Sequence, residues 1–336
     1  MTLLAGIIPA EHAAGHTLVL PCPDGPVAVS PMASAWFSDV TWLREPSRAS
    51  GARKMTGARF RGIQQAESVT PGVMRLGEEH IATGPFAVEG ERLAEVSLKA
   101  PKAEAYVLAR SDGLRDVRAP APTSYDDRDG IARSFPQALP QGGELRVIQW
   151  AVAAARKTGG VLLADGHRLM APDPTGSVNL TLYSAHPLAS GDILPLLRAF
   201  IATAEVGADQ PTADGSPHYR LVGPTAYDGS IVIDVERVDR VPRALAELDW
   251  RSYGPFAYRM SWVPANPYEL DLEQPSGLHV IARARMRSSM ARLAVTLQSR
   301  IAGIVVDDGG FVAGAGELET RNDPQAGTGS GGRAWV

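Results

Sequence analysis

The sequence predicts an α+β protein: tandem ferredoxin-like (βαββαβ) modules with a β-rich N-terminal region. Between residues 103 and 316, apolar runs of strand length alternate with segments of helical apolar spacing, and the order reads β-α-β-β-α-β twice. Residues 1–102 are instead rich in proline and glycine and contain short β runs. The predicted domains are the β-rich, loop-heavy region 1–102, the modules 103–229 and 230–316, and a flexible tail 317–336.

The first module is assembled from segments of alternating type. One helix stops where Gly159 and Gly160 follow its last apolar residues. Leu180 and Leu182 alternate with polar residues, as in a half-buried strand. The predicted elements are strand 103–113, helix 143–160, strand or tight hairpin 161–171, strand 178–188, helix 190–207 and a strand that starts at 219.

The second module starts after the Asp228-Gly229 turn, with Ile231, Ile233 and Val235 on one face of a strand. The elements that follow are a short helix 241–250, the strands 256–264 and 278–286, the helix 288–301 and the apolar run 303–313.

Two stretches support this architecture. Ala155–Pro172 (ARKTGGVLLADGHRLMAP) and Gln298–Ala315 (QSRIAGIVVDDGGFVAGA) both read as a helix end, a small-residue stop, a β run, an Asp-Gly turn and an apolar run. A βαβ unit needs its helix to stop sharply before the next strand. The repetition therefore indicates two βαβ units. The stretches do not occupy equivalent places in the two predicted modules, so they do not by themselves establish a duplication.

Composition excludes several classes of function. The chain has 336 residues, a net charge of -4 and a single cysteine, Cys22. It can form no internal disulfide and no cysteine-based zinc site. No apolar run reaches membrane-spanning length, and the net charge does not favour nucleic acid. Arginine, alanine and glycine predominate, as in bacteria with GC-rich genomes. We expect a cytoplasmic protein that takes neither nucleic acid nor a membrane as its partner.

The first candidate site is the segment IARARMR. In a strand, Arg283, Arg285 and Arg287 would share one face, where their guanidinium groups could bind a small anionic ligand or a protein partner. The alternative is a solvated sheet face on which Asp234 or Glu236 pairs with the arginines.

Other clusters carry weaker signals. The basic stretch 44–62 favours a loop over a polyanion site, because it lacks interleaved aromatic residues. His12 and His16 have the spacing of half a zinc site, and no motif completes it. Glu78, Glu79 and His80 could contribute ligands only in three dimensions. Ser184, His186 and Asp192 include the residue types of a nucleophilic triad but lack a nucleophile elbow. The sequence predicts no catalytic residue, no metal and no cofactor.

For function, the sequence favours a non-enzymatic binding or regulatory protein that uses the cleft or sheet face of its modules for a small anionic ligand or a protein partner. The alternative is an enzyme, of hydrolase or isomerase type, whose site assembles in three dimensions from histidines and carboxylates. A pocket that contains two or more of four particular histidines together with a carboxylate would favour the enzyme, whereas an apolar groove or a flat arginine face would favour binding. The first histidines to inspect are His167, His186, His218 and His279. The sequence is compatible with a homo-oligomer and does not give the oligomeric state.

Overall fold

The computed structural model describes residues 3–48, 69–123, 125–210, 212–213, 215–272 and 274–322. The fold is mixed α+β with large antiparallel sheets, which confirms the predicted class. The chain divides into two compact units. Unit 1 comprises Met1–Ala33, Phe37–Thr123 and Ile131–Ala171, and unit 2 comprises Ser34–Trp36, Ser124–Gly130 and Pro172–Val336.

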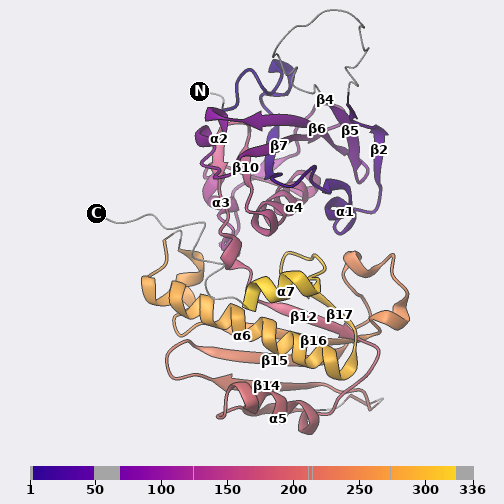
Figure 1. Ribbon diagram of the computed structural model, residues 1–336, viewed down its shortest axis with the longest axis vertical. Coiled ribbons are helices and arrows are strands. Elements are labelled where there is room, and N and C mark those ends of the chain that lie inside the picture. The colour runs from indigo at the N-terminus through magenta and orange to yellow at the C-terminus, as the bar shows by residue number, and fades with distance from the viewer. Residues whose placement is uncertain are drawn as a thin grey trace, which may run out of the picture. The chain divides into compact units, whose positions relative to one another are not determined.

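Unit 1 contains a seven-stranded sheet in the order β11-β10-β1-β7-β6-β5-β2, in which all neighbours are antiparallel. Its strands are β1 (His16–Pro21), β2 (Val40–Arg44), β5 (Gly72–Leu76), β6 (His80–Glu89), β7 (Lys102–Arg110), β10 (Val161–Ala164) and β11 (Arg168–Met170). Short pairs join β3 (Ser47–Arg48) to β4 (Val69–Thr70) and β8 (Arg118–Ala119) to β9 (Leu139–Pro140). The helices are α1 (Val29–Ser34), α2 (Glu91–Glu95), α3 (Ile131–Ser134) and α4 (Gly142–Thr158). Helix α4 packs on β1 and β10 (Figure 1).

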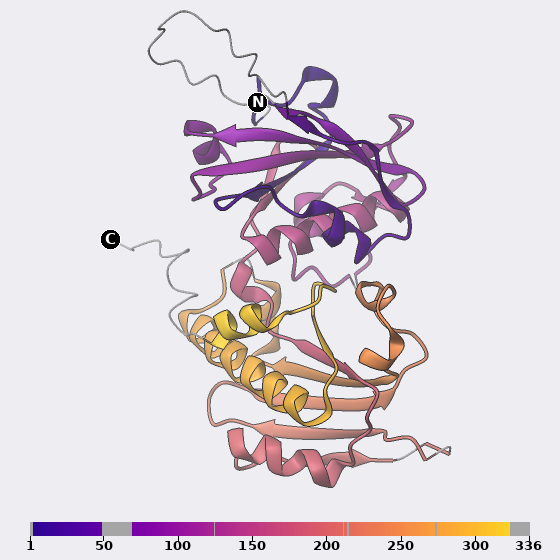
Figure 2. The ribbon, with the colours of Figure 1, turned by 45° about the vertical axis from the view of Figure 1, so that its right-hand side comes forward.

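Unit 2 contains a six-stranded sheet in the order β13-β14-β15-β16-β12-β17, again with antiparallel neighbours. Its strands are β12 (Leu180–Ser184), β13 (Glu205–Asp209), β14 (Tyr219–Pro224), β15 (Ser230–Arg237), β16 (Phe256–Val263) and β17 (Ile304–Asp307). Its helices are α5 (Ser190–Phe200), α6 (Gly277–Ile301) and α7 (Ala315–Asn322). Helix α6 lies along the sheet and contacts β12, β16 and β17 (Figure 2).

The two units repeat one topology. In unit 1, β1 lies between β7 and β10 and is antiparallel to both, so β7 and β10 are parallel to each other and are joined by α4. In unit 2, β12 lies between β16 and β17 in the same way, and α6 joins them. The sheet orders are β10-β1-β7-β6-β5-β2 in unit 1 and β17-β12-β16-β15-β14-β13 in unit 2. If the strands of each of these orders are numbered along the chain, the two orders are identical. Each unit therefore contains a split β-α-β arrangement.

This topology explains why the sequence repeats. A glycine stands between the end of α4 and β10, and another between the end of α6 and β17, because the backbone there lies close to a carbonyl oxygen of the neighbouring strand. A Cβ on Gly160 would lie 2.4 Å from the carbonyl oxygen of Val19, and one on Gly303 would lie 2.2 Å from that of Tyr183. Val19 pairs with Val161 on β10, and Tyr183 pairs with Ile304 on β17. The two glycines therefore occupy equivalent positions in the two units.

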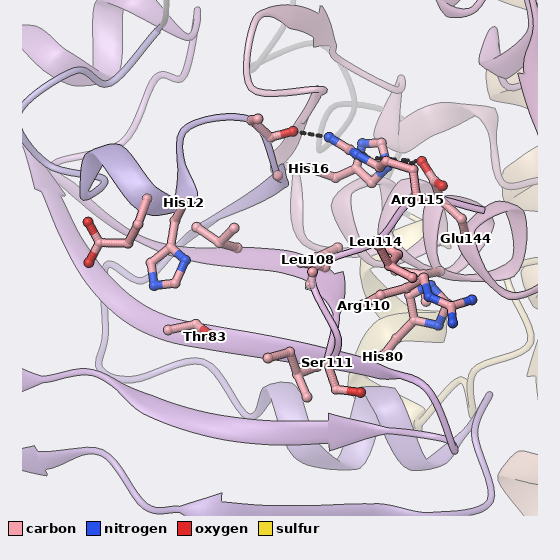
Figure 3. Close-up of a pocket in the computed structure, with 18 residues that line it drawn as sticks. His12, His16, His80, Thr83, Leu108, Arg110, Ser111, Leu114, Arg115 and Glu144 are labelled. Carbon is pink, nitrogen blue, oxygen red and sulfur yellow. Dashed lines mark hydrogen bonds and ion pairs between the residues drawn. The ribbon is translucent and has the colours of Figure 1, made fainter. Parts of the chain in front are cut away.

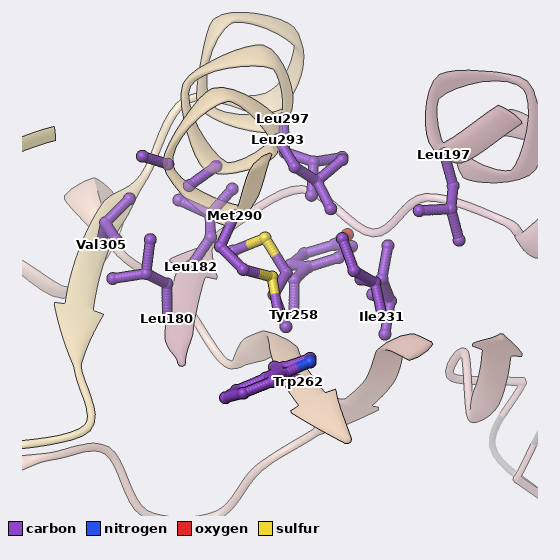
Figure 4. Close-up of a cluster of buried hydrophobic side chains, with 14 of the residues drawn as sticks. Leu180, Leu182, Leu197, Ile231, Tyr258, Trp262, Met290, Leu293, Leu297 and Val305 are labelled. Carbon is purple, nitrogen blue, oxygen red and sulfur yellow. The ribbon is translucent and has the colours of Figure 1, made fainter. Parts of the chain in front are cut away.

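The core of unit 2 lies between its sheet and α6. Met290, Leu293 and Leu297 of α6 point toward the sheet (Figure 4), where Leu182 and Tyr258 are fully buried. Leu197, on helix α5, belongs to the same cluster. The buried apolar residues of α6 therefore lie on the face of the helix that packs against the sheet.

The predicted strand 278–286 is wrong, because these residues lie inside α6. The prediction followed the alternation of arginine with alanine. The buried residues instead recur at helical spacing, and Oγ of Ser276 accepts the backbone N–H of His279 as an N-cap, at 3.2 Å. The apolar positions concerned are Ala282, Met286, Met290, Leu293 and Leu297. Among the described helices, none is long and apolar enough to cross a membrane.

Other predicted elements also differ from the structure. The predicted helix 190–207 ends at Phe200, and residues 205–207 belong to β13. Residues 317–322, predicted as the start of a flexible tail, belong to α7, and the rest of that tail lies outside the described residues. The predicted helix 241–250 is reduced to the 3-10 turns Arg243–Leu245 and Trp250–Ser252. The predicted module borders fall between strands that pair directly, β6 with β7 and β14 with β15. The two compact units divide the chain after residue 171, except that residues 34–36 and 124–130 belong to unit 2.

Candidate functional site

Unit 1 contains a cavity of about 310 Å³ (Figure 3). Its wall is formed at one end of the sheet, by β1, β6 and β7, together with the loop after β7 and the first turns of α4. The polar side chains on the wall come from residues far apart in the sequence. They include His12, His16, His80, Arg110, Arg115 and Glu144.

Glu144 is the centre of a buried network on this wall. Its side chain is only 4% exposed and lies in the first turn of α4. Oε1 accepts hydrogen bonds from Nε2 of His16 at 3.0 Å, Nη1 of Arg115 at 3.2 Å and Nη2 of Arg118 at 2.8 Å. Burial alone would raise the pKa of Glu144, but His16 and Arg118 together lower it to about 2. The carboxylate is therefore ionised across the physiological range.

The same residue links α4 to the loop after β7. A carboxylate oxygen of Asp116 accepts the backbone N–H of Glu144 at 2.7 Å, and Oε2 of Glu144 accepts the backbone N–H of Asp116 at 3.0 Å. Nη1 of Arg110 donates to the other oxygen of Asp116 at 2.6 Å. Asp116 thus satisfies a free N–H at the start of α4 from a distant loop, as a capping residue would.

His16 is held in one tautomer by its neighbours. Its Nδ1 accepts the backbone N–H of Asp165 at 3.0 Å, so Nε2 carries the proton that is donated to Glu144. The carboxylate of Asp165 binds Arg118 at 2.9 Å and Arg115 at 3.2 Å. The imidazole of His16 therefore has both nitrogens engaged and is held in place.

His16, Glu144 and Asp165 also form a group whose potential metal-binding atoms lie within 4.8 Å of one another. Both carboxylates are neutralised by arginine, however, and the histidine already uses both nitrogens. A cation would have to displace Arg115 and Arg118. The geometry is that of an ion-pair network that holds β1, α4 and β10 together.

His80 differs from these residues. It is the first residue of β6 and is buried, yet its Nε2 has no hydrogen-bond partner among the described residues. The nearby Oδ2 of Asp116 is 4.0 Å away. Burial lowers the pKa of His80, against an opposing effect of Asp116. Gly143 makes room for the ring, since a Cβ there would lie 2.7 Å from Cε1 of His80. His80 is thus a buried cavity-lining histidine whose Nε2 has no hydrogen-bond partner among the described residues.

The three arginines predicted to bind a ligand do not share one face. Arg283 and Arg287 are one helical turn apart on α6, whereas Arg285 is exposed and pairs with Asp228 at 3.4 Å. The predicted common face was wrong because it required a strand.

The histidines singled out for an enzyme lie outside the cavity. His167, His186 and His218 are exposed, and His279 is buried against Trp262 with ring centroids 5.0 Å apart. The suggested nucleophile is also engaged. Ser184 Oγ donates to the carbonyl of Ile301 at 2.8 Å and accepts the backbone N–H of His186.

Of the weaker candidates, His12 and His16 both line the cavity but lie in different elements, a 3-10 turn and β1. They do not share the helix face that their spacing suggested. Most of the basic stretch 44–62 lies outside the described residues. Sequence reasoning missed Glu144, Arg115 and Asp116, which carry no local motif.

Comparisons of this chain with protein-family models, with curated proteins and with solved structures gave no match.

Proposed function

We propose that this chain is a non-enzymatic binding protein whose unit 1 takes a small organic molecule into the cavity beside His80. The observation that carries the proposal is His80, which lines a cavity of about 310 Å³ and whose buried Nε2 has no hydrogen-bond partner among the described residues. Buried polar groups are normally satisfied, and exceptions mark places where a ligand or water completes the bonding. The volume is at the lower end of small-molecule sites, which begin at roughly 300 Å³.

The wall indicates the chemistry of the ligand. Apolar side chains, including Ile81, Val107 and Leu108, form much of it. Three charged residues of the wall are ion-paired, Arg110 to Asp112 and Asp116, and Arg115 to Glu144, whereas Glu11 also lines the cavity. A charged ligand would compete with these pairs, so the best fit is a neutral molecule with an apolar body and one group that hydrogen-bonds to His80.

The enzyme remains the second candidate, because the cavity holds histidines and a carboxylate. His80 would be its general base, since its lowered pKa keeps it neutral at pH 7. A general base is normally oriented by a third group, however, and the imidazole of His80 forms no hydrogen bond with the described residues. Binding is therefore favoured over catalysis.

The proposal extends to the fold. The split β-α-β arrangement in each unit supports the interpretation of the chain as two ferredoxin-like modules. Their borders would then follow the two units and not the predicted residues 103, 230 and 316.

Replacing His80 with leucine tests the proposed site. Saturation-transfer NMR with phenol, indole and acetanilide should detect binding of at least one probe to the full-length chain. In His80→Leu the affinity for that probe should fall about tenfold, the effect of losing one buried hydrogen bond. The thermal midpoint should not fall, because leucine removes an unsatisfied buried polar atom at similar volume.

His167→Leu is the matched control, since His167 is exposed and outside the cavity. It should leave probe binding unchanged. Equal affinity in wild type and His80→Leu, or no binding of any probe to the wild type, would contradict the proposed site.

A further inference from the structure

A second cluster of charges lies in unit 2, where residues 173–177 pack on α6. Nη2 of Arg283 donates to the carboxylate of Asp173 and, at 3.1 Å, to Oγ1 of Thr175. Nε of Arg287 donates to the carbonyl oxygen of Ser177 at 3.3 Å. The two arginines are four residues apart and lie on the same face of the helix. The segment 173–177 therefore binds both arginine side chains.

Arg283 is incompletely bonded. Its side chain is 13% exposed, and its Nε is buried without a hydrogen-bond partner among the described residues. A buried N–H of a charged group that makes no hydrogen bond is costly, because it has lost its hydration. Asp173 neutralises the charge of Arg283 but leaves this donor unused.

Arg287 has no ion pair within the described part of the chain, and its bond to Ser177 uses only Nε. Burial lowers the pKa of Arg287, and the neighbouring Arg321 adds to that effect. Glu317, Asp173 and Asp308 oppose it from a distance. The Nη donors of Arg287 are therefore available to a bound group.

The carboxylates of Glu317 and Asp307 pair with Arg321. Arg321 binds Glu317 at 2.7 Å and lies 3.6 Å from Asp307, and its Nη1 donates to the carbonyl of Ser177 at 3.2 Å. The hydroxyl of Ser177 donates to Asp308. Arg321 is thus paired, whereas Arg287, which donates to the same carbonyl oxygen, has no ion pair with the described residues.

We propose that Arg283 and Arg287 form a binding site for an oxyanion, the phosphate or carboxylate group of a small molecule. The planar fork of Arg287 supplies two parallel N–H donors, and Nε of Arg283 supplies a third. An oxyanion there gives Arg287 the counter-charge that the described residues do not provide. This site retains two of the three arginines predicted from the sequence and omits Arg285. It is independent of the cavity in unit 1.

The test measures the thermal midpoint of the full-length protein in sodium phosphate and in sodium acetate, each against sodium chloride of equal ionic strength. Phosphate should raise the midpoint of the wild type above the chloride value, and titration calorimetry should detect its binding. Arg287→Gln should remove the phosphate-specific rise. Arg285→Gln should retain it, because Arg285 lies on another face of α6 and is exposed. His80→Leu should also retain it, which separates this site from the cavity.

Acetate distinguishes the two kinds of oxyanion. A rise with both salts indicates a general oxyanion site, and a rise with phosphate alone indicates a phosphate site; either result supports the proposal. Because Arg287 has no ion pair with the described residues, Arg287→Gln should fold with an unchanged or higher midpoint in chloride. Arg283→Gln provides a second test of phosphate binding. No anion-specific rise in the wild type, or an equal rise in Arg287→Gln, would overturn the proposal.

Discussion

Replacing Glu144 with glutamine should lower the free energy of unfolding of unit 1 by about 3–5 kcal/mol at pH 7, the range observed when one partner of a buried ion pair is removed. The reason is the number of groups that depend on this carboxylate. His16, Arg115 and Arg118 all donate to Oε1 of Glu144. A neutral amide would leave the two guanidinium groups with Asp165 as their remaining carboxylate.

Urea unfolding followed by circular dichroism measures this loss. The chain has two compact units, so two transitions are expected, and only one should move. Glu79→Gln is the control. Glu79 pairs with Arg110 but is 57% exposed, and such surface pairs contribute about 0–1 kcal/mol. A loss no larger in Glu144→Gln than in Glu79→Gln would contradict the importance of the buried network.

The same carboxylate should make unit 1 sensitive to acid. The pKa of Glu144 is about 2 in the folded chain, against 4.5 for an ordinary glutamate. Its stabilising effect is therefore complete above about pH 4.5 and is lost as the pH falls toward 2. Urea titrations at several pH values should show a shallower acid dependence in Glu144→Gln than in the wild type. Parallel pH profiles would argue against the lowered pKa.

Gly303→Ala should destabilise unit 2 by about 3 kcal/mol, and Gly160→Ala should destabilise unit 1 by about 1–3 kcal/mol. In both, the new Cβ would overlap a backbone carbonyl, that of Tyr183 or of Val19. Gly303 has the larger expected effect because its φ is +113°, a conformation that alanine rarely adopts.

Urea unfolding of each variant again provides the measurement. The control is Gly191→Ala in α5, where a Cβ would meet no atom within 4 Å and the helical backbone favours alanine. It should be neutral or slightly stabilising. If Gly160→Ala and Gly303→Ala were as stable as this control, the close approach of strand and helix end would not be the reason for the repeated glycines.

Most strands of the fold were predictable from local patterns. The alternation around Leu180, Leu182 and Ile231 correctly indicated β12 and β15, and the glycines after α4 marked its end. The failure at α6 has a local cause. Arg283, Arg285 and Arg287 alternate with small residues over a short window, while the helical period appears only when the window extends to Leu297.

The candidate site was much less predictable. His16 and Glu144 are 128 positions apart, yet Nε2 and Oε1 lie 3.0 Å from each other. No spacing rule connects them, because the contact depends on β1 and α4 being brought together by the sheet. His80 follows Glu78 and Glu79, but this stretch does not show which groups the imidazole faces. Its free nitrogen becomes visible only when its surroundings are known.

By itself, the sequence determined the α+β class, most strands and helices, and the repetition of a helix end that leads into a strand. These follow from periodicity and turn residues, which act over a few positions along the chain. Only the tertiary structure decided that the repeat comprises two units of one topology and that three guanidinium groups do not share a face. It alone shows that Nε2 of His80, a cavity-lining residue, has no hydrogen-bond partner in the described part of the chain. Pairing across a sheet and burial of charge both depend on residues far apart in sequence, so no local pattern records them.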